Sequence, residues 1–273
     1  MHCSKILKRV LSISTALLLA GCSLTDDSAS APERQVDGGI LWVHSAAEFE
    51  ALSLQAYRAA TEDLDKFIAD TSWSALPDQR DADELPMAIV ADVDETIVSN
   101  VEFQMALEPP FVISDFYDWN DANKSRPIPG AAKFVTLAQQ SGVEVFFVTN
   151  RPCEVTAGSA DPCLQRQITL QDIVETGIST DLDHVMLSNE RAEWDREKVV
   201  RRNHIAQTHR VIMLLGDDLG DFIPCTRRKA LKPCAAGATV ASRLADTKKY
   251  DHYWGEGWYV LPNPMHGSWT TVD

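Results

Sequence analysis

Apolar residues in the second half of the chain form short runs that are separated by longer amphipathic stretches. The runs with strand character are 87–93, 143–149, 184–187 and 211–215, and a last short run at 258–261 is a candidate for a further strand. The intervening stretches 131–140, 164–175 and 195–207 repeat apolar residues at helical spacing. Strands that alternate with helices predict an α/β fold, with a parallel sheet covered by helices on both faces.

The first half of the chain has a different pattern. Apolar residues recur at helical spacing over 40–69, which predicts either two helices or one long bent helix. An acidic loop with prolines follows at about 70–86. Residues 23–38 are small, polar and acidic, as is typical of a flexible tether.

The N-terminal residues read as a targeting segment rather than as part of the fold. Lys5, Lys8 and Arg9 precede an apolar run at 11–20, which is too short to span a bilayer but has the length of a signal-peptide core. The run ends in the sequence L-A-G-C at Cys22, which resembles the lipobox of bacterial lipoproteins. An ordinary secretory signal is the alternative interpretation.

The lipobox resemblance implies a signal peptide at 1–21, acylation of Cys22 and a tether at 22–39. Acyl chains anchor a protein to a membrane without spanning it. Ser23 stands where an inner-membrane retention signal would place Asp, so we expect an outer-membrane lipoprotein that faces the periplasm or the cell surface.

The net charge excludes one large class of partners. The formal charge is −15, and residues 1–21 carry three of the 25 basic residues and none of the 40 acidic ones. The mature chain therefore has 25 − 3 = 22 basic against 40 acidic residues, or −18. Such a charge repels nucleic-acid backbones, and no basic stripe reverses it. A small phosphate ester would need a metal ion and a few local cations to enter a site.

Four cysteines remain besides Cys3 and Cys22, and an exported chain can oxidise them. Four cysteines allow three pairings. Each close pair brackets a short loop, which favours Cys153–Cys163 and Cys225–Cys234, with free thiols as the alternative. No C-x-x-C spacing indicates a zinc site.

Polar side chains follow the predicted strands at the points where the strands end. Asp92 and Asp94 follow the first strand and, two apart on extended chain, can project to the same side. The ends of two other strands carry further polar residues, namely Thr149, Asn150 and Arg151 after one and Asp217, Asp218 and Asp221 after the other. A predicted helix adds the cation Lys198. Because ligands of parallel sheets bind at the carboxyl ends of the strands, these groups predict a shared site.

These residue types suit phosphoryl transfer, which needs positioning and neutralisation of charge. One carboxylate can be the nucleophile, and a second carboxylic acid can protonate the leaving oxygen and then activate water. Mg²⁺ favours hard oxygen ligands such as aspartates. Lys198 and the Thr149 hydroxyl can hold phosphate oxygens, and Asn150 and Arg151 are further candidates for substrate binding.

Four motifs resemble those of the haloacid dehalogenase (HAD) superfamily. They are D-x-D-E-T at Asp92, the hydroxyl of Thr149, Lys198 and the G-D-D acid at Asp217. Within this superfamily, they resemble the class C acid phosphatases of the lipoprotein e, 5'-nucleotidase type. The resemblance covers about 40–270 and implies a Rossmann-like three-layer core with a small, mostly helical cap. We expect a phosphatase domain at 40–273, with the N-terminal helices at about 40–70 and an insertion at about 100–128 contributing to the cap.

Residue by residue, the resemblance implies that Asp92 is the nucleophile and Asp94 the general acid and base. One Mg²⁺ would be held by the Asp92 carboxylate, the Asp94 carbonyl oxygen and Asp217. Asp218 and Asp221 would support this metal site.

Proteins of this type act on nucleoside 5'-monophosphates and other phosphomonoesters, with the base stacked between two aromatic rings. Phe111 stands where one ring is expected, with packing inside the cap as the alternative role. His266 replaces the tyrosine expected to supply the other ring, which weakens the expectation of nucleotide preference. Two other functions stay open: the same chemistry on sugar or other small organic phosphates, and a non-catalytic lipoprotein that binds haem or a nucleotide. Retention of Asp92 and Asp94 disfavours the second. No pattern predicts an oligomeric state.

Overall fold

The structure is a computed structural model that describes residues 36–122, 124–154 and 163–272. The predicted signal peptide, Cys22 and nearly all of the predicted tether therefore lie outside the described residues. Among the described helices, none is long and apolar enough to cross a membrane.

The centre of the described chain is a five-stranded sheet in which all neighbouring strands run parallel. Its order is β5-β4-β1-β6-β7, with β1 Met87–Ala91, β4 Glu144–Pro152, β5 Val185–Ser188, β6 Arg210–Gly216 and β7 Trp258–Val260. The predicted strands, including the last short one, are thereby confirmed. After β1 the chain builds outward through β4 and β5 and then returns to the other side of β1 at β6. Such a reversal of strand order is where ligands bind in doubly wound sheets.

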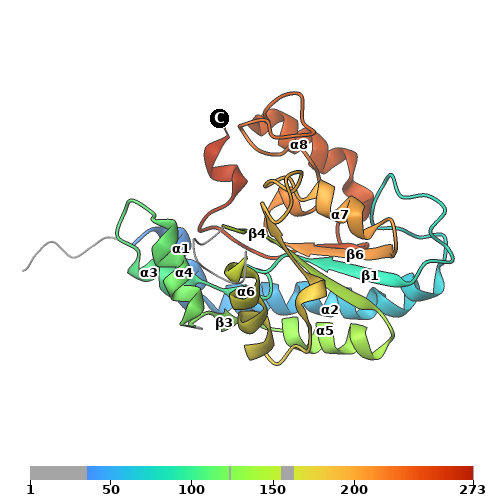
Figure 1. Cartoon of the computed structure of the whole chain (residues 1–273), viewed down its shortest axis with the longest axis horizontal. Helices are drawn as coiled ribbons and strands as arrows, with labels where there is room; N and C mark the ends of the chain where they lie inside the picture. The colour runs from blue at the N-terminus through green and yellow to red at the C-terminus, as the bar shows by residue number, and fades with distance from the viewer. Residues whose placement is uncertain (1–35, 123, 155–162, 273) are drawn as a thin grey trace, which may run out of the picture. The chain divides into compact units, whose positions relative to one another are not determined.

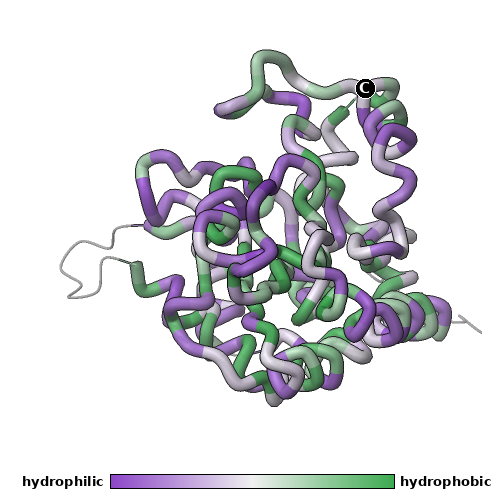
Figure 2. Tube along the Cα trace, turned by 90° about the vertical axis from the view of Figure 1, so that its right-hand side faces the viewer, coloured by the Kyte–Doolittle hydropathy of each residue, from purple (hydrophilic) through white to green (hydrophobic). Residues whose placement is uncertain are grey.

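Alternate residues of the central strands face opposite layers of helices. Ile89 and Ala91 of β1 belong to one buried apolar cluster, whereas Ala88 and Val90 belong to the other. Helices α2 (Ala47–Ala69) and α5 (Ala131–Gln140) pack on the first face, together with α6 (Leu164–Glu175). The short helix α7 (Val199–Ile205) covers the second face (Figure 1). Figure 2 shows hydrophobic residues, in green, running through the interior, and hydrophilic residues, in purple, mainly in the outer segments. The predicted α/β fold is confirmed.

The N-terminal pattern forms two helices, α1 (Gly38–Ser45) and α2. Ala46 separates them because its extended conformation ends the first helix and precedes the second. Helix α1 packs against α3, whereas α2, which we expected to contribute to the cap, packs against α5 and the sheet. The Tyr57 hydroxyl of α2 donates a hydrogen bond to the Thr96 carbonyl at 2.6 Å, so this helix also braces the loop that follows β1.

The insertion after β1 forms the small cap. It contains the antiparallel pair β2 (Val98–Ser99) and β3 (Arg126–Pro127), and between them the helices α3 (Val101–Ala106) and α4 (Ile113–Asp121). Gly130 then leads into α5 with φ of +96°, and a Cβ there would lie 2.9 Å from the Cβ of Tyr57. Only glycine therefore lets the chain return from the cap to the core at this point.

The remaining described elements are one helix and several short turns. Helix α8 spans Val240–Lys249. Four short 3₁₀ turns occur in the described residues: η1 Leu182–His184, η2 Leu219–Asp221, η3 Asp251–Tyr253 and η4 Ser268–Thr271. The turn η2 follows β6 almost directly and so places Asp221 back beside the strand end.

Candidate active site

The carboxyl ends of β1, β4 and β6 bring the predicted polar residues to one edge of the sheet. Asp92 follows β1 directly, Thr149 lies in the C-terminal half of β4, and Asp217 follows β6. Because β1 lies between β4 and β6, the groups from all three strand ends converge on Asp92. The structure therefore brings together at one sheet edge the strand-end residues that the sequence argument expected to share a site.

Three carboxylates form the centre of this site. Oxygen atoms of Asp92, Asp217 and Asp221 all lie within 4.8 Å of one another. Asp221 approaches so closely because Gly216 has no side chain, since a Cβ there would lie 2.2 Å from an Asp221 carboxylate oxygen. The glycine of the G-D-D motif thus creates the space for a third acid.

One ammonium group lies among these acids. The Lys198 Nζ binds the Asp92 carboxylate and lies 2.6 Å from Asp221 Oδ1, with 5% of its side chain exposed. Burial lowers the pKa of Lys198, but Asp221 and Asp92 outweigh it and the net change is a raised pKa. The lysine is therefore charged in this site.

A single ammonium does not balance three carboxylates. Burial raises the pKa of Asp92 to about 7, Lys198 opposes this change, and Asp221 and Asp94 add to it. Burial and the charges of Asp92 and Asp221 raise the pKa of Asp217 well above its usual value. Unbalanced carboxylate oxygens at this spacing are the donor set that a divalent cation prefers, so the residues fit a bound Mg²⁺.

The Asp94 carboxylate is held by three neighbouring groups. Arg151 donates from Nε at 3.1 and 3.0 Å and from a terminal nitrogen at 2.7 Å. The Asn100 amide donates at 2.7 Å, and the Thr149 hydroxyl lies 3.3 Å away. Burial raises the pKa of Asp94, but the Arg151 charge and hydrogen bonds outweigh it, so the net pKa is lowered.

Arg151, which we expected to bind substrate, is engaged within the protein. Its side chain is 2% exposed and pairs with Asp94 and with Asp172 of α6. Such a guanidinium is not available to a substrate phosphate without breaking buried ion pairs. Sequence reasoning missed Asp172, because nothing marks an acid within a helix as the partner of a distant arginine.

Asn150, the other expected substrate contact, is tied to a buried arginine. Arg201 of α7 donates to Asn150 Oδ1 at 2.8 Å and also binds the Thr149 carbonyl. Arg201 is fully buried. It therefore fixes the backbone and the amide at the end of β4.

Asp218 and Asp221, the expected metal-supporting acids, have different surroundings. Asp221 belongs to the carboxylate cluster. Asp218 instead accepts hydrogen bonds from the Gly220 N–H at 2.8 Å and from the Ser268 hydroxyl at 2.8 Å. Asp218 therefore anchors the C-terminal segment, and it is not among the grouped carboxylates.

The C-terminal segment also contacts the site at two further points. The Asn263 amide donates to Asp217 Oδ2 at 2.6 Å. His266 Nε2 lies 3.1 Å from Glu95 Oε2, with 40% of the histidine side chain exposed. Glu95 is buried, has φ of +59°, and accepts from the Asn100 N–H at 2.7 Å. Burial lowers the pKa of His266, but Glu95 outweighs it and the net pKa is raised.

Phe111 lies in the cap and remains accessible. Its side chain is 52% exposed. It packs edge-on against Phe103 at 6.1 Å and tilted against Phe116 at 6.2 Å between ring centroids. Cap packing and an accessible ring face are thus both present.

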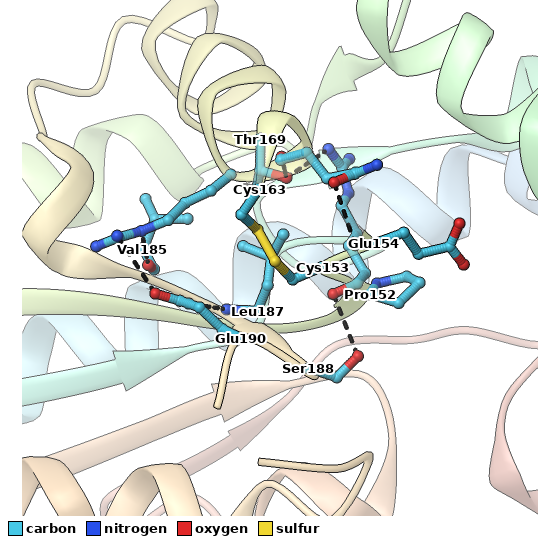
Figure 3. Close-up of a disulfide and its surroundings, with 12 residues drawn as sticks. Pro152, Cys153, Glu154, Cys163, Thr169, Val185, Leu187, Ser188 and Glu190 are labelled. Atoms are coloured by element: carbon cyan, nitrogen blue, oxygen red, sulfur yellow. Dashed lines mark hydrogen bonds and ion pairs between the residues drawn. A yellow bond between two sulfur atoms is a disulfide. The ribbon is translucent and has the colours of Figure 1, made fainter. Parts of the chain in front are cut away.

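Both predicted disulfides are present. Cys153 bonds Cys163, and Cys225 bonds Cys234. Cys153 follows β4 directly and Cys163 caps the start of α6, so the first bond joins the strand end to the helix. Figure 3 shows this bond between the strand end with Pro152 and the helix with Thr169. Residues 155–162 between the two cysteines lie outside the described residues.

Comparison with known proteins gives consistent matches. Residues 31–269 match the family described as HAD superfamily, subfamily IIIB (acid phosphatase). The fold is similar to the class C acid phosphatase from Bacillus anthracis, with a TM-score of 0.67 and 24% sequence identity over 85% of this chain and 84% of that chain. A second structure of that enzyme, with tungstate bound, matches with the same TM-score of 0.67 and the same 24% identity and coverage.

Proposed function

We propose, from the premise that the chain belongs to the acid phosphatases of HAD subfamily IIIB and is a phosphomonoesterase, that it works through a phospho-aspartate at Asp92. The observation that carries this proposal is the position of Asp92. It is a buried carboxylate at the switch point of the sheet, in contact with Lys198 and close to Asp217 and Asp221.

The first step is the transfer of the phosphoryl group to Asp92. A carboxylate oxygen of Asp92 forms a bond to phosphorus while the bond to the ester oxygen breaks. At acidic pH Asp94 takes up a proton, against the lowering of its pKa by Arg151, and gives this proton to the departing oxygen, so that an alcohol leaves. Lys198 and the Thr149 hydroxyl, on either side of the two aspartates, are placed to stabilise the charge on the phosphate oxygens.

The second step returns the enzyme to its starting state. Asp94, now a carboxylate, takes a proton from a water molecule that attacks phosphorus. The bond between phosphorus and the Asp92 oxygen breaks, and inorganic phosphate leaves. The hydrogen bonds from Asn100 and Arg151 hold Asp94 in one orientation for both proton transfers.

The resident cation in this proposal is one Mg²⁺. The Asp92 carboxylate, the Asp94 carbonyl oxygen and Asp217 would hold it, with Asp221 as the nearest further acid. When bound, the ion neutralises charge on the phosphoryl group and on the carboxylates. The carboxylates that Lys198 leaves unbalanced support this assignment.

The proposed substrates are nucleoside 5'-monophosphates. The exposed face of Phe111 and the half-exposed His266 are the groups that would contact a base. In the related Bacillus anthracis enzyme, tungstate, an oxyanion, has been bound, which is consistent with a site for the phosphate part alone. A screen of phosphate release over nucleotides, sugar phosphates and aryl phosphates decides whether the base matters.

Anchoring at the outer membrane through acylated Cys22 is a further part of the proposal, and its support is the L-A-G-C sequence after the apolar run. Mass spectrometry of the protein from membranes should give an N-terminal Cys22 with the mass of attached acyl chains. An unmodified N-terminus at another residue would reject the anchor and leave the catalytic proposal intact.

The test of the catalytic proposal is Asp92→Asn, which keeps the shape but removes the attacking charge. We expect phosphate release to fall by on the order of 10⁴ with the fold retained. Asp65→Asn on the exposed side of α2 is the matched control and should leave the rate unchanged. Excess chelator should abolish the wild-type rate and Mg²⁺ should restore it. Near-normal turnover by Asp92→Asn would reject the nucleophile, and activity in chelator would reject the metal.

A further inference from the structure

We propose that Asp172 is a positioning residue for phosphoryl transfer, which fixes Arg151 so that Arg151 in turn fixes the Asp94 carboxylate. Asp172 lies on α6, away from the motifs that indicate the site, and it touches none of the three grouped aspartates in the contacts of the described residues. The inference rests on the proposed role of Asp94 as the proton donor.

The three side chains form a continuous chain of charge-assisted hydrogen bonds. Arg151 binds Asp94 through Nε and one terminal nitrogen, at 3.0 and 2.7 Å. Its other terminal nitrogen donates to Asp172 Oδ2 at 2.5 Å and lies 3.4 Å from the Thr169 hydroxyl. A guanidinium is planar and rigid, so contacts on both sides fix its plane. Without Asp172, the guanidinium would keep its contacts with Asp94, the long contact with the Thr169 hydroxyl and the contact with the Phe116 ring, but would lose its second ion pair.

Burial makes a role in stability alone a poor explanation for Asp172. The side chains of Asp172 and Arg151 are 1% and 2% exposed. Buried ion pairs are often no more stabilising than apolar residues of similar volume, because removing the charges from water is costly. Asp172 Oδ1 also has no hydrogen-bond partner among the described residues. Such unsatisfied polar atoms concentrate at functional sites.

The fold rigidly connects the two ends of this chain. Arg151 is the penultimate residue of β4, and Asp172 lies two turns into α6. The Cys153–Cys163 disulfide joins the end of β4 to the N-cap residue of α6 (Figure 3). Thr169 is three residues before Asp172 and therefore on the same face of α6. Strand, helix and disulfide together keep the distance between Asp172 and Arg151 short.

The inference predicts a specific kinetic signature. A proton donor matters little for an aryl phosphate, whose phenolate leaves easily, and much for an alkyl phosphate, whose alkoxide does not. Hydrolysis of the phospho-aspartate is common to all substrates, so the readout is kcat/KM, which covers the steps up to phosphorylation of Asp92. Loss of Asp94 orientation should lower kcat/KM for the alkyl ester far more than for the aryl ester. A purely structural residue would lower both values together.

The experiment compares Asp172→Asn and Arg151→Lys with the wild type on 4-nitrophenyl phosphate and on glycerol 3-phosphate, with Mg²⁺ present. Arg151→Lys keeps the positive charge but loses the planar guanidinium that can donate to Asp94 and Asp172 at the same time. Glu175→Gln, an exposed position on the same helix, is the matched control and should change nothing. We expect kcat/KM on the alkyl ester to fall roughly 10- to 100-fold more than kcat/KM on the aryl ester.

Asp94→Asn in the same assay separates the two proposals. If Asp94→Asn lowers kcat/KM for both esters equally, the proposed proton donor is wrong and the proposed function fails in that part. If Asp94→Asn shows the leaving-group dependence but the folded Asp172→Asn and Arg151→Lys do not, the positioning role is overturned. Thermal unfolding identifies which variants are folded, and Arg151→Lys decides the question if Asp172→Asn does not fold.

Discussion

At the scale of single residues, Lys198 has a large expected effect on stability. It is buried between Asp92 and Asp221, and each of these acids would be left without its ammonium if the lysine were removed. Removal of one partner from a buried pair costs about 3–5 kcal/mol. Lys198→Met should therefore lower the denaturation midpoint and abolish phosphate release.

The control for this prediction is Lys133→Met, an exposed position on α5. Because a bound cation stabilises the folded state, Mg²⁺ should recover part of the lost stability of Lys198→Met. An unchanged midpoint for Lys198→Met would contradict the electrostatic description of the site.

His266 shows why one residue could not be interpreted from sequence alone. The sequence places it where a base-stacking tyrosine is expected, but its Nε2 also pairs with the buried Glu95. Glu95 belongs to the D-x-D-E-T motif, so the sequence does mark it as a residue of the site. No sequence pattern connects Glu95 to a histidine near the C-terminus. The pair connects the C-terminal segment to the loop that bears Asp94.

The test of His266 is His266→Tyr. If the ring contacts a base, this variant should lower KM for a nucleoside monophosphate and leave KM for an aryl phosphate unchanged. Because the pKa of His266 is raised from 6.5 by Glu95, the ion pair is fully formed below about pH 6.5 and is lost as the pH rises through the higher folded value. The wild-type KM for nucleotides should therefore change above pH 6.5. Equal KM changes for both substrates would mean that His266 acts only through Glu95.

At the scale of elements, apolar runs identified the strands because β1, β4, β5 and β6 are buried on both faces over most of their length. Helix α7 is shorter than the predicted 195–207, because the Asp195 side chain accepts from the Glu197 N–H at 2.7 Å and forms a turn before the helix. That turn brings Lys198 to the helix start. Helix α8 had no sequence prediction, since it has no buried residue and so lacks the apolar pattern on which prediction depends.

The opposite edge of the sheet carries a group of charged residues that predicts a dependence of stability on pH. Glu144 at the start of β4 lies 3.1 Å from His184 Nε2 and 3.3 Å from His209 Nε2. Burial lowers the pKa of His184, but Asp181 and Glu144 outweigh it and raise it above 6.5. Burial raises the pKa of Glu144, but both histidines outweigh it and lower it below 4.5.

The directions of these two pKa shifts define the pH range in which the charged group stabilises the folded protein. The His184 contribution is complete below about pH 6.5 and is lost as the pH rises through its raised folded pKa. The Glu144 contribution is complete above about pH 4.5 and is lost as the pH falls through its lowered folded pKa. Glu144→Gln should thus lower the melting temperature more at pH 5.5 than at pH 8.5. The same decrease at both pH values would contradict the prediction.

At the scale of the whole molecule, the parallel sheet explains why much of the site was predictable. Carboxyl ends of parallel strands share one edge, so Asp92, Thr149 and Asp217 had to converge once the strands were identified. The return of the C-terminal segment to Asp217 and Asp218 was not predictable, because no periodicity links residues so far apart in the chain. The Asp172 pairing was hidden for the same reason.

The central claim is that Asp92 becomes phosphorylated, and covalent trapping tests it most directly. The enzyme is mixed with an aryl phosphate and Mg²⁺, quenched in acid during turnover and treated with borohydride, which reduces an acyl phosphate to an alcohol. Peptide mass spectrometry should then find homoserine at position 92, and none in the Asp92→Asn protein or without substrate. Reduction at Asp94, Asp217 or Asp221 instead, or an unmodified Asp92 in enzyme that releases phosphate at its full rate, would contradict the account.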